Sequence, residues 1–137
     1  MARDACAALV LHGAACVDEG DAAAFADLFP VDGVLVRPNG APLVGRTAIR
    51  DAYALRSADR LTRHVVTNQR VILDSTDRAR VQSLVTLWGG SAVDTAGPQG
   101  RPTTSAQVLG EFDDLLSLTP DGWRIARREA RFLFHTT

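Results

Sequence analysis

The sequence predicts an α+β fold, in which three N-terminal helices cover a strongly curved antiparallel sheet that forms a cone-shaped barrel. Two observations support this prediction. Apolar residues recur at helical spacing in the first part of the chain, and from Thr62 onward they alternate with a period of two. Helices followed by a run of strands are typical of α+β domains. The chain has 137 residues, 46% of them hydrophobic, which fits one domain with one core over residues 1–137.

The ends of the first two helices are marked by residues that favour helix termini. The first helix is expected from Asp4 to Glu19, because Gly20 is a favourable residue just after a helix. Asp21 can cap the second helix through its carboxylate, and Pro30 ends that helix. The core side of the second helix comprises Phe25, Leu28 and Phe29.

Two short strands and a third helix are expected next. Val34–Arg37 is β-prone, and the turn Pro38–Pro42 connects it to a hairpin partner at Leu43–Gly45. Thr47 is the expected N-cap of the third helix. The apolar side of this helix comprises Ile49, Ala52, Tyr53 and Leu55.

The second half of the chain is expected to form four long antiparallel strands: Arg63–Leu73, Arg78–Trp88, Thr104–Leu118 and Trp123–Phe134. The segment Gly89–Pro102, rich in glycine and proline, is predicted to be a loop. The inward-facing residues of the second long strand are expected to be Ala79, Val81, Ser83, Val85 and Leu87. Three helices are too few to cover strands of this length, so we expect a cone with a pocket for a small hydrophobic molecule.

Charge and cysteine content exclude several classes of function. The chain has 15 basic residues, all arginine, and 16 acidic ones. Because these charges nearly balance, neither nucleic acid nor an acidic membrane is a predicted partner. Cys6 and Cys16 are separated by about 15 Å of helix, which is beyond disulfide reach. With no Cys-x-x-Cys and only three histidines, no metal or other cofactor is expected. The short apolar N-terminus predicts no signal peptide and no membrane span, and reduced cysteines fit a cytoplasmic protein.

Asp18 and His64 are the strongest candidates for catalysis. Asp18 lies in the last turn of an apolar helix, where the helix dipole disfavours a carboxylate by up to about 1 kcal/mol. His64 opens a β-prone run, and the ordinary histidine pKa of about 6.5 suits a general base. Residues that break local rules without local gain tend to mark functional sites, so we predict an acid–base pair inside the pocket. The alternative is a solvated carboxylate and a core or interface histidine.

Other side chains are candidates for contacts with the ligand. Asn68 lies four residues after His64 and thus on the same expected strand face, where it can hydrogen-bond a ligand oxygen or bridge backbone groups. Four aromatic residues are expected to line the pocket or to fill the core: Phe25, Phe29, Tyr53 and Phe112. Asp113 and Asp114 are expected to form cross-strand ion pairs of small individual value with arginines of the last strand.

Short motifs follow one another along the chain in an order that is more specific than any one of them. They are Asp18–Asp21, Val31–Val34, Gly40, Gly45–Ile49, Arg63–Asn68, Gly110–Asp114 and Asp121–Ile125 with Arg128. In this order they resemble the nuclear transport factor 2-like superfamily and, more narrowly, its SnoaL-like branch. Relatives of that branch include scytalone dehydratase and the small subunit of ring-hydroxylating dioxygenases. The resemblance covers essentially the whole chain and implies a cystatin-like cone.

The resemblance also implies roles for individual residues. In scytalone dehydratase-like enzymes an aspartate at the end of the first helix orients a histidine on the third strand, which removes a proton from the substrate. Asp18 and His64 occupy these positions. The dehydratase also carries a tyrosine before the aspartate, where this chain has Val17, and a histidine on the fourth strand, where Arg78–Trp88 has none. These missing groups assist the leaving hydroxyl, so the resemblance supports proton transfer rather than that particular dehydration.

Two functions follow as hypotheses. The first is a cofactor-independent lyase or isomerase that transfers a proton on a hydrophobic carbonyl or hydroxy compound. The second is a non-catalytic ligand-binding or assembly module, such as an oxygenase small-subunit-like protein, because one fold serves many functions. A homodimer is expected, with a trimer as the alternative, through an uncovered sheet face that carries Trp88, Leu116 and Leu118.

Overall fold

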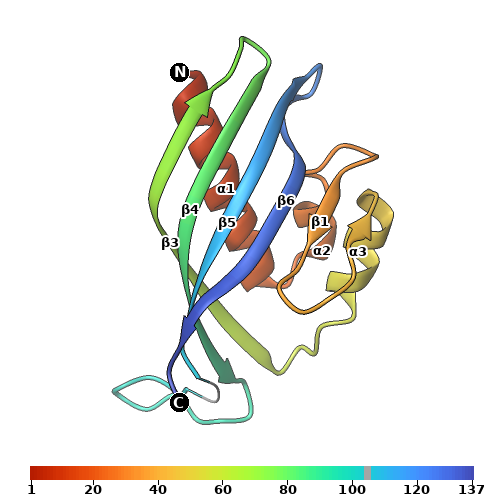
Figure 1. Ribbon diagram of the computed structural model, residues 1–137. Helices are drawn as coiled ribbons and strands as arrows, with labels where there is room; N and C mark the ends of the chain where they lie inside the picture. The colour runs from red at the N-terminus through yellow and green to blue at the C-terminus, as the bar shows by residue number, and fades with distance from the viewer. Residues whose placement is uncertain (104–105) are drawn as a thin grey trace.

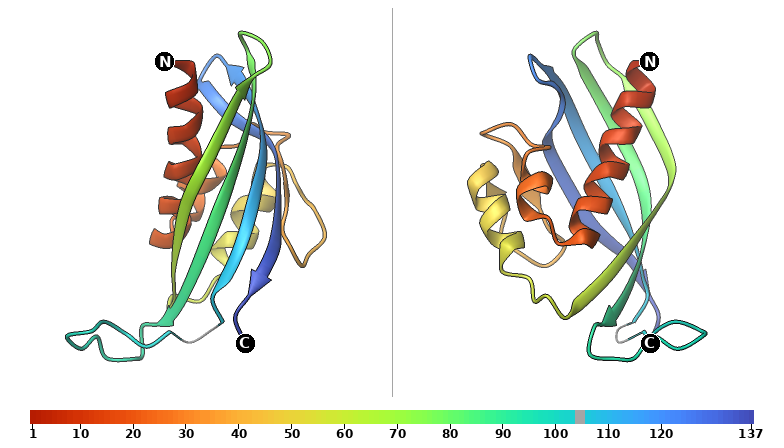
Figure 2. Two further views of the ribbon diagram at one scale, coloured as in Figure 1. Left: turned by 60° about the vertical axis from the view of Figure 1, so that its left-hand side comes forward. Right: turned by 180° about the vertical axis from the view of Figure 1, so that it is seen from behind.

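Three helices and one six-stranded sheet make up the computed structural model, which describes residues 1–103 and 106–137. The helices are α1 (Ala2–Glu19), α2 (Ala22–Ala26) and α3 (Arg46–Ala54). The strands are β1 (Val34–Val36), β2 (Leu43–Val44), β3 (Arg60–Leu73), β4 (Arg78–Ser91), β5 (Val108–Thr119) and β6 (Gly122–His135). The sheet order is β2-β1-β6-β5-β4-β3, and all three helices lie on one face of the twisted sheet (Figures 1 and 2). The predicted α+β architecture is confirmed.

The junction of α1 and α2 forms as predicted. Gly20 adopts a left-handed conformation with φ 75°, which glycine tolerates, and its N–H donates to a carbonyl in the last turn of α1. The Asp21 carboxylate accepts a hydrogen bond of 3.0 Å from the backbone N–H of Ala24. This tight turn fixes the C-terminal end of α1, where Asp18 lies.

The start of α3 differs from the prediction, because Gly45 and not Thr47 is its N-cap. Gly45 has a φ of 94°, a conformation that residues with a side chain rarely adopt. Its backbone N–H donates to the carbonyl of Gly33 at 2.7 Å, and the N–H of Arg46 donates to the carbonyl of Val31 at 3.0 Å. The chain therefore already turns into the helix at Gly45, two residues before the predicted cap.

The four long strands pair with one another in antiparallel fashion, and the short strand β1 pairs in both directions. It runs antiparallel to β2 and parallel to β6, which the long connection between β1 and β6 permits. β3 begins at Arg60, three residues before the predicted start, and β4 extends to Ser91 rather than Trp88. The predicted start of the next strand, Thr104, lies outside the described residues, and β5 begins at Val108.

Irregularities in register bend the sheet and change which residues face the helices. One lies in β3 between Thr67 and Arg70, where Asn68 has a positive φ of 51°. Another lies between β5 and β6, where Leu115 pairs with Arg127 but Leu116 pairs with Ile125. Such bulges increase the local twist and shift the alternation of side chains between the two faces.

The core lies between the helices and the inner face of the sheet. Its buried members are Cys6, Val10, Cys16, Phe25, Ala26, Leu28, Phe29, Leu35, Ile49, Ala79, Val81, Leu116 and Ile125. The predicted inward set of β4 is confirmed, with Leu87 half-buried and the other four residues buried. In the described part of the chain, no helix combines the length and apolar character needed to cross a membrane.

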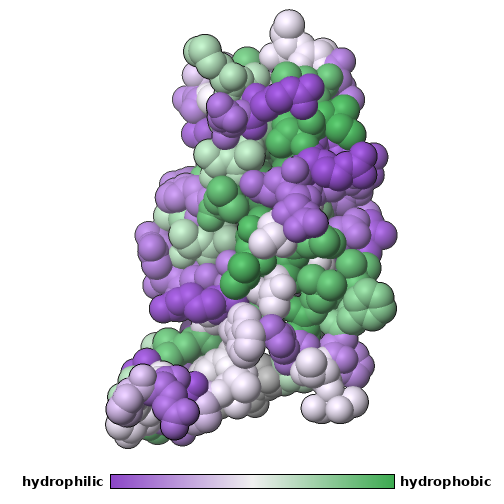
Figure 3. Space-filling view, turned by 90° about the vertical axis from the view of Figure 1, so that its left-hand side faces the viewer, coloured by the Kyte–Doolittle hydropathy of each residue, from purple (hydrophilic) through white to green (hydrophobic). Residues whose placement is uncertain are grey.

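The outer face of the sheet differs in part from the prediction. Trp88 is exposed there, but Leu116 is only 2% exposed and pairs with Ala79 and Ile125 in the core. Leu118 follows Leu116 by two residues and so belongs to the same inner face, although it lies beyond the core and is exposed. Figure 3 views the molecule from the side of β3 and shows groups of hydrophobic side chains separated by hydrophilic ones.

Candidate functional site

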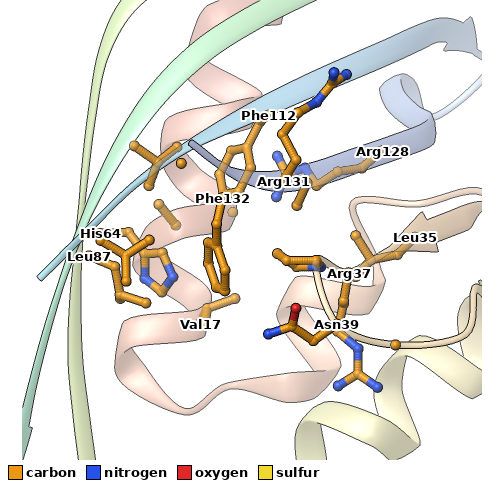
Figure 4. A pocket seen from close by; sticks show the side chains of 18 of the residues that line it. Val17, Leu35, Arg37, Asn39, His64, Leu87, Phe112, Arg128, Arg131 and Phe132 are labelled. Carbon is orange, nitrogen blue, oxygen red and sulfur yellow. The ribbon is translucent and has the colours of Figure 1, made fainter. Parts of the chain in front are cut away.

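A cavity of about 390 Å³ lies between the helices and the inner face of the sheet. This volume suits a small organic molecule. The apolar and aromatic part of its lining includes Val17, Phe25, Leu35, Tyr53, Leu87, Phe112 and Phe132. In the view of Figure 4, His64 and Leu87 lie on one side of the pocket, and Arg37 and Asn39 lie on the other.

The structure brings Asp18 and His64 into direct contact. His64 Nδ1 lies 2.5 Å from Asp18 Oδ1, and the backbone N–H of His64 donates to Asp18 Oδ2 at 2.9 Å. The hydroxyl of Thr62 donates to Asp18 Oδ1 at 2.9 Å. Three donors from β3 thus hold a carboxylate that the helix end disfavours, since hydrogen bonds to a charged group outweigh the dipole effect.

The contact with Asp18 determines which nitrogen of His64 is available to a ligand. A carboxylate at Nδ1 favours the tautomer in which Nδ1 carries the proton, so Nε2 keeps its lone pair. The two side chains are only 16% and 12% exposed, for His64 and Asp18 respectively. Burial lowers the pKa of His64, and the charges of Arg56 and Arg128 act in the same direction, against the opposing effect of Asp18. His64 is therefore a neutral base at neutral pH.

Tyr53 is a polar aromatic residue in the lining of the pocket. Its ring packs against Phe25 at 4.7 Å between centroids, and the guanidinium of Arg56 lies 6.0 Å from its ring centroid. Burial raises the pKa of Tyr53, so the side chain stays a neutral phenol. Among the described residues the Tyr53 hydroxyl has no hydrogen-bond partner, which leaves it able to donate to a ligand oxygen.

A buried ion pair forms another part of the pocket wall. Arg128 donates to both oxygens of Asp114, at 2.7 and 3.0 Å, and its guanidinium lies 4.0 Å from the ring centroid of Phe112. The side chains of Arg128 and Asp114 are 4% and 0% exposed. Burial raises the pKa of Asp114, and the charge of Arg128 opposes that shift. The sequence predicted an ion pair in this region but not its burial or its place in the pocket.

Asn68 does not reach the pocket, contrary to the prediction. It is exposed and occupies the bulge of β3, where the regular alternation of side chains between the two faces of the strand is interrupted. Asparagine tolerates the positive φ of this position better than most residues. The next residue, Gln69, turns toward the helices instead and donates to the carbonyl of Ala7 in α1 at 3.3 Å.

Of the four predicted aromatic contacts, Phe25, Tyr53 and Phe112 line the pocket and Phe29 does not. Phe29 is fully buried and packs edge-to-face against Phe25, with 5.3 Å between ring centroids. A side chain at Gly33 would come within 2.8 Å of its Cβ, which shows how tightly this region is filled. Phe29 belongs to the core that closes the cavity on the α2 side.

Arginines at the pocket are the residues that sequence reasoning missed. Arg37, Arg56 and Arg60 all line the cavity, as does Arg128. Arg60 belongs to β3 and lies four residues before His64, so it is on the same face of the strand. This spacing is visible in the sequence, but it places Arg60 in the pocket only if the strand is taken to begin at Arg60. Among the described residues, no group of three or more histidine, cysteine or acidic side chains forms a metal-binding cluster.

Comparisons with known proteins agree with this architecture. The sequence profile described as a SnoaL-like domain matches residues 1–129. A candidate scytalone dehydratase from Novosphingobium aromaticivorans is 21% identical, with a TM-score of 0.80, over 97% of this chain and 85% of that one. A candidate dehydratase of the NTF2-like family from Streptomyces avermitilis is 19% identical, with a TM-score of 0.80, over 96% of this chain and 95% of that one.

A third solved structure has a different assignment. It is a candidate aromatic ring hydroxylase from Novosphingobium aromaticivorans, 25% identical, with a TM-score of 0.75, over 98% of this chain and 92% of that one. No curated protein sequence gives a significant match. The likeness to the two dehydratase structures shows the fold alone, because proteins of one fold carry out different reactions.

Proposed function

The chain belongs to the SnoaL-like domain family, and we propose that it is a cofactor-independent lyase or isomerase that transfers a proton on a small hydrophobic carbonyl or hydroxy compound. One observation carries this proposal. His64 contacts Asp18 through Nδ1 and lines the cavity, and this contact favours the tautomer in which Nε2 is unprotonated. A base of this kind needs a pKa near or below the working pH, and burial of His64 supplies it.

The proposed step moves one proton and needs no redox partner. His64 Nε2 takes a proton from the carbon next to the substrate carbonyl, and the carboxylate of Asp18 stabilises the imidazolium that forms. The Tyr53 hydroxyl donates a hydrogen bond to the carbonyl oxygen, on which negative charge develops. The proton then returns from Nε2 either to another carbon, which completes an isomerisation, or to a departing hydroxyl, which leaves as water.

Hydrogen–deuterium exchange at carbon tests this step without knowledge of the natural substrate. A panel of small aromatic and alicyclic ketones is incubated with the protein in D2O, and loss of the proton next to the carbonyl is followed by 1H NMR. We expect catalysed exchange with at least one ketone, and a decrease of about 10²–10⁴-fold in His64→Ala, because general base catalysis contributes that much. Asp18→Asn should reduce the rate constant more than it weakens ketone binding.

His12→Ala is the matched control, since His12 is exposed on α1 and lies outside the cavity lining. Its exchange rate should equal that of the unmodified protein. A rate in His64→Ala equal to that of the control would overturn the role of His64. Absence of exchange with every ketone would overturn proton transfer and favour the ligand-binding module, to which the likeness to a candidate ring hydroxylase points.

We also propose that the chain forms a homodimer through the outer face of the sheet. Four apolar side chains of that face are between 41% and 46% exposed: Val65, Ile72, Trp88 and Leu115. Exposed apolar surface of this kind favours association. Light scattering after size-exclusion chromatography should give a dimer mass that Trp88→Ser reduces and that Val44→Ser, an exposed control on β2, leaves unchanged. A monomer at micromolar concentration would contradict the proposal.

A further inference from the structure

The charged side chains around the cavity are strongly unbalanced. Its lining contains five arginines and a single acidic residue, Glu111. Glu111 and Arg131 are neighbours in the ladder of β5 and β6 and alternate onto the outer face, away from the helices, where Arg131 forms an ion pair with Glu129. Arg128 is neutralised by its ion pair with Asp114. The remaining positive charge belongs to Arg37, Arg56 and Arg60.

None of these three arginines forms an ion pair with a described acidic residue. Asp18 attracts Arg56, but both Asp18 oxygens already accept hydrogen bonds from β3. The guanidinium of Arg37 lies over Gly40, with Nη2 3.8 Å from the position that a Cβ would occupy there. The donors of these side chains are therefore available to a molecule in the cavity.

Arg56 and Arg60 also repel each other. Arg56 is half-buried at the end of α3, and both its burial and the charge of Arg60 lower the pKa of its guanidinium. Charges of the same sign are unfavourable near one another unless an anion lies between them. Arg56 influences His64 as well, since its charge lowers the pKa of the imidazole. The unbalanced positive charge thus lies close to the candidate base.

We propose that the ligand of this cavity is an organic carboxylate, whose acid group is bound by Arg56 and Arg60 with Arg37 at the edge of the pocket. The planar guanidinium matches a carboxylate in geometry and can bind both its oxygens. The apolar lining formed by Phe112, Phe132 and Leu87 accommodates the rest of the molecule. This inference deepens the proposed function, because it rests on the same cavity and specifies the substrate as an acid.

The carboxylate would also position the substrate for proton transfer. An acid group held at Arg56 and Arg60 directs the apolar part of the molecule into the cavity, where His64 Nε2 is available. Arg56 and Arg60 act here as binding and positioning residues, and they do not take part in the movement of the proton. Their replacement should therefore weaken binding of an acid without changing the tautomer of His64.

Binding of two probes that differ only in charge tests the proposal. Phenylacetate and phenylacetamide have the same size and shape, and their affinities for the full chain are measured by titration calorimetry and by 1H–15N NMR shifts. We expect phenylacetate to bind more tightly than phenylacetamide by about tenfold or more, as charge-assisted hydrogen bonds predict. Arg56→Gln, and more strongly Arg56→Gln with Arg60→Gln, should remove this preference.

Two further variants separate the possible failures. Arg70→Gln removes one exposed positive charge outside the cavity lining, and it should retain the preference for phenylacetate. His64→Ala should also retain it, because anion binding does not need the base. Equal affinity for the two probes, or a preference that survives loss of Arg56 and Arg60, would overturn this inference. The proton-exchange experiment does not depend on that outcome, so it tests the proposed function independently of the charge of the ligand.

Discussion

Two adjacent aspartates on β5 form similar ion pairs with arginine on opposite faces of the sheet, and the two pairs differ in burial. Asp113 faces outward and accepts two hydrogen bonds from Arg80, at 2.9 and 2.7 Å. Asp114 faces inward and accepts two from Arg128, at 2.7 and 3.0 Å. The geometry is nearly equal, but the side chain of Arg80 is 42% exposed and that of Arg128 only 4%.

The electrostatic consequences of the two pairs are opposite. The hydrogen bonds from Arg80 lower the pKa of Asp113, whereas burial raises the pKa of Asp114. The outer pair stays in contact with water and stabilises little. The inner pair has lost its water, so each member depends on the other. Burial, rather than hydrogen-bond length, therefore determines how much each ion pair contributes to the free energy of unfolding. The polar side chains that depend on a partner, because water does not reach them, lie at the cavity.

The largest effect is expected from breaking the inner pair. Asp114→Asn removes the carboxylate and leaves the guanidinium of Arg128 buried without a counter-charge. We expect a loss of about 3–5 kcal/mol in the free energy of unfolding, measured by urea denaturation with circular dichroism. A loss close to zero would show that Arg128 finds another partner or moves into water, and would contradict the distinction between the faces.

A smaller effect is expected from the pH dependence of stability. Burial lowers the pKa of His64 below that of an unfolded histidine, while Asp18 opposes this shift and Arg56 and Arg128 reinforce it. Below about pH 6.5 the unfolded chain therefore binds more protons at this residue than the folded chain, so its contribution to stability is lost as the pH falls toward the folded pKa. Urea denaturation at neutral and mildly acidic pH should show this loss.

His64→Gln is the control for this pH effect, because glutamine does not titrate. The variant should lose less stability than the unmodified protein between the two pH values. An equal loss in both proteins would mean that other groups dominate the titration in this range.

The smallest effect is expected on the outer face. Asp113→Asn makes the same chemical change as Asp114→Asn one residue away, but water can solvate the partner Arg80. The change in the free energy of unfolding, from the same urea experiment, should be far below that of Asp114→Asn. Equal changes for the two variants would remove the basis of the comparison.

Periodicity alone was enough to predict the parts of the fold without bulges. The inward set of β4, from Ala79 to Leu87, follows a strict period of two and is confirmed. The meeting of Asp18 and His64 was also predicted. Their positions at a helix end and a strand start made them candidates, and the resemblance to scytalone dehydratase-like enzymes implied that these two positions converge inside the cone. What the sequence did not show is that β3 begins at Arg60, which adds this residue to the face of His64.

Bulges account for the main errors at the site. The one extra residue in β3 moves Asn68 out of the row that begins at His64. The register shift after Ile125 brings Arg128 inward, although a regular period of two from Ile125 places it outward. Bulges depend on pairing with a neighbouring strand, so a single strand's sequence does not locate them.

The proposed chemistry requires that Asp18 holds a neutral His64 whose Nε2 is a free base in the cavity. Nitrogen-15 NMR of histidine-labelled protein, with the His64 signals assigned by comparison with His64→Ala, reports the protonation of each ring nitrogen directly. We expect a protonated Nδ1 and an unprotonated Nε2 at pH 7. The pKa of His64 should lie below about 6.5 and fall further in Asp18→Asn, because Asp18 raises it. A protonated Nε2 at pH 7, or a pKa above that of an ordinary histidine, would show that His64 is not the free base that proton transfer requires.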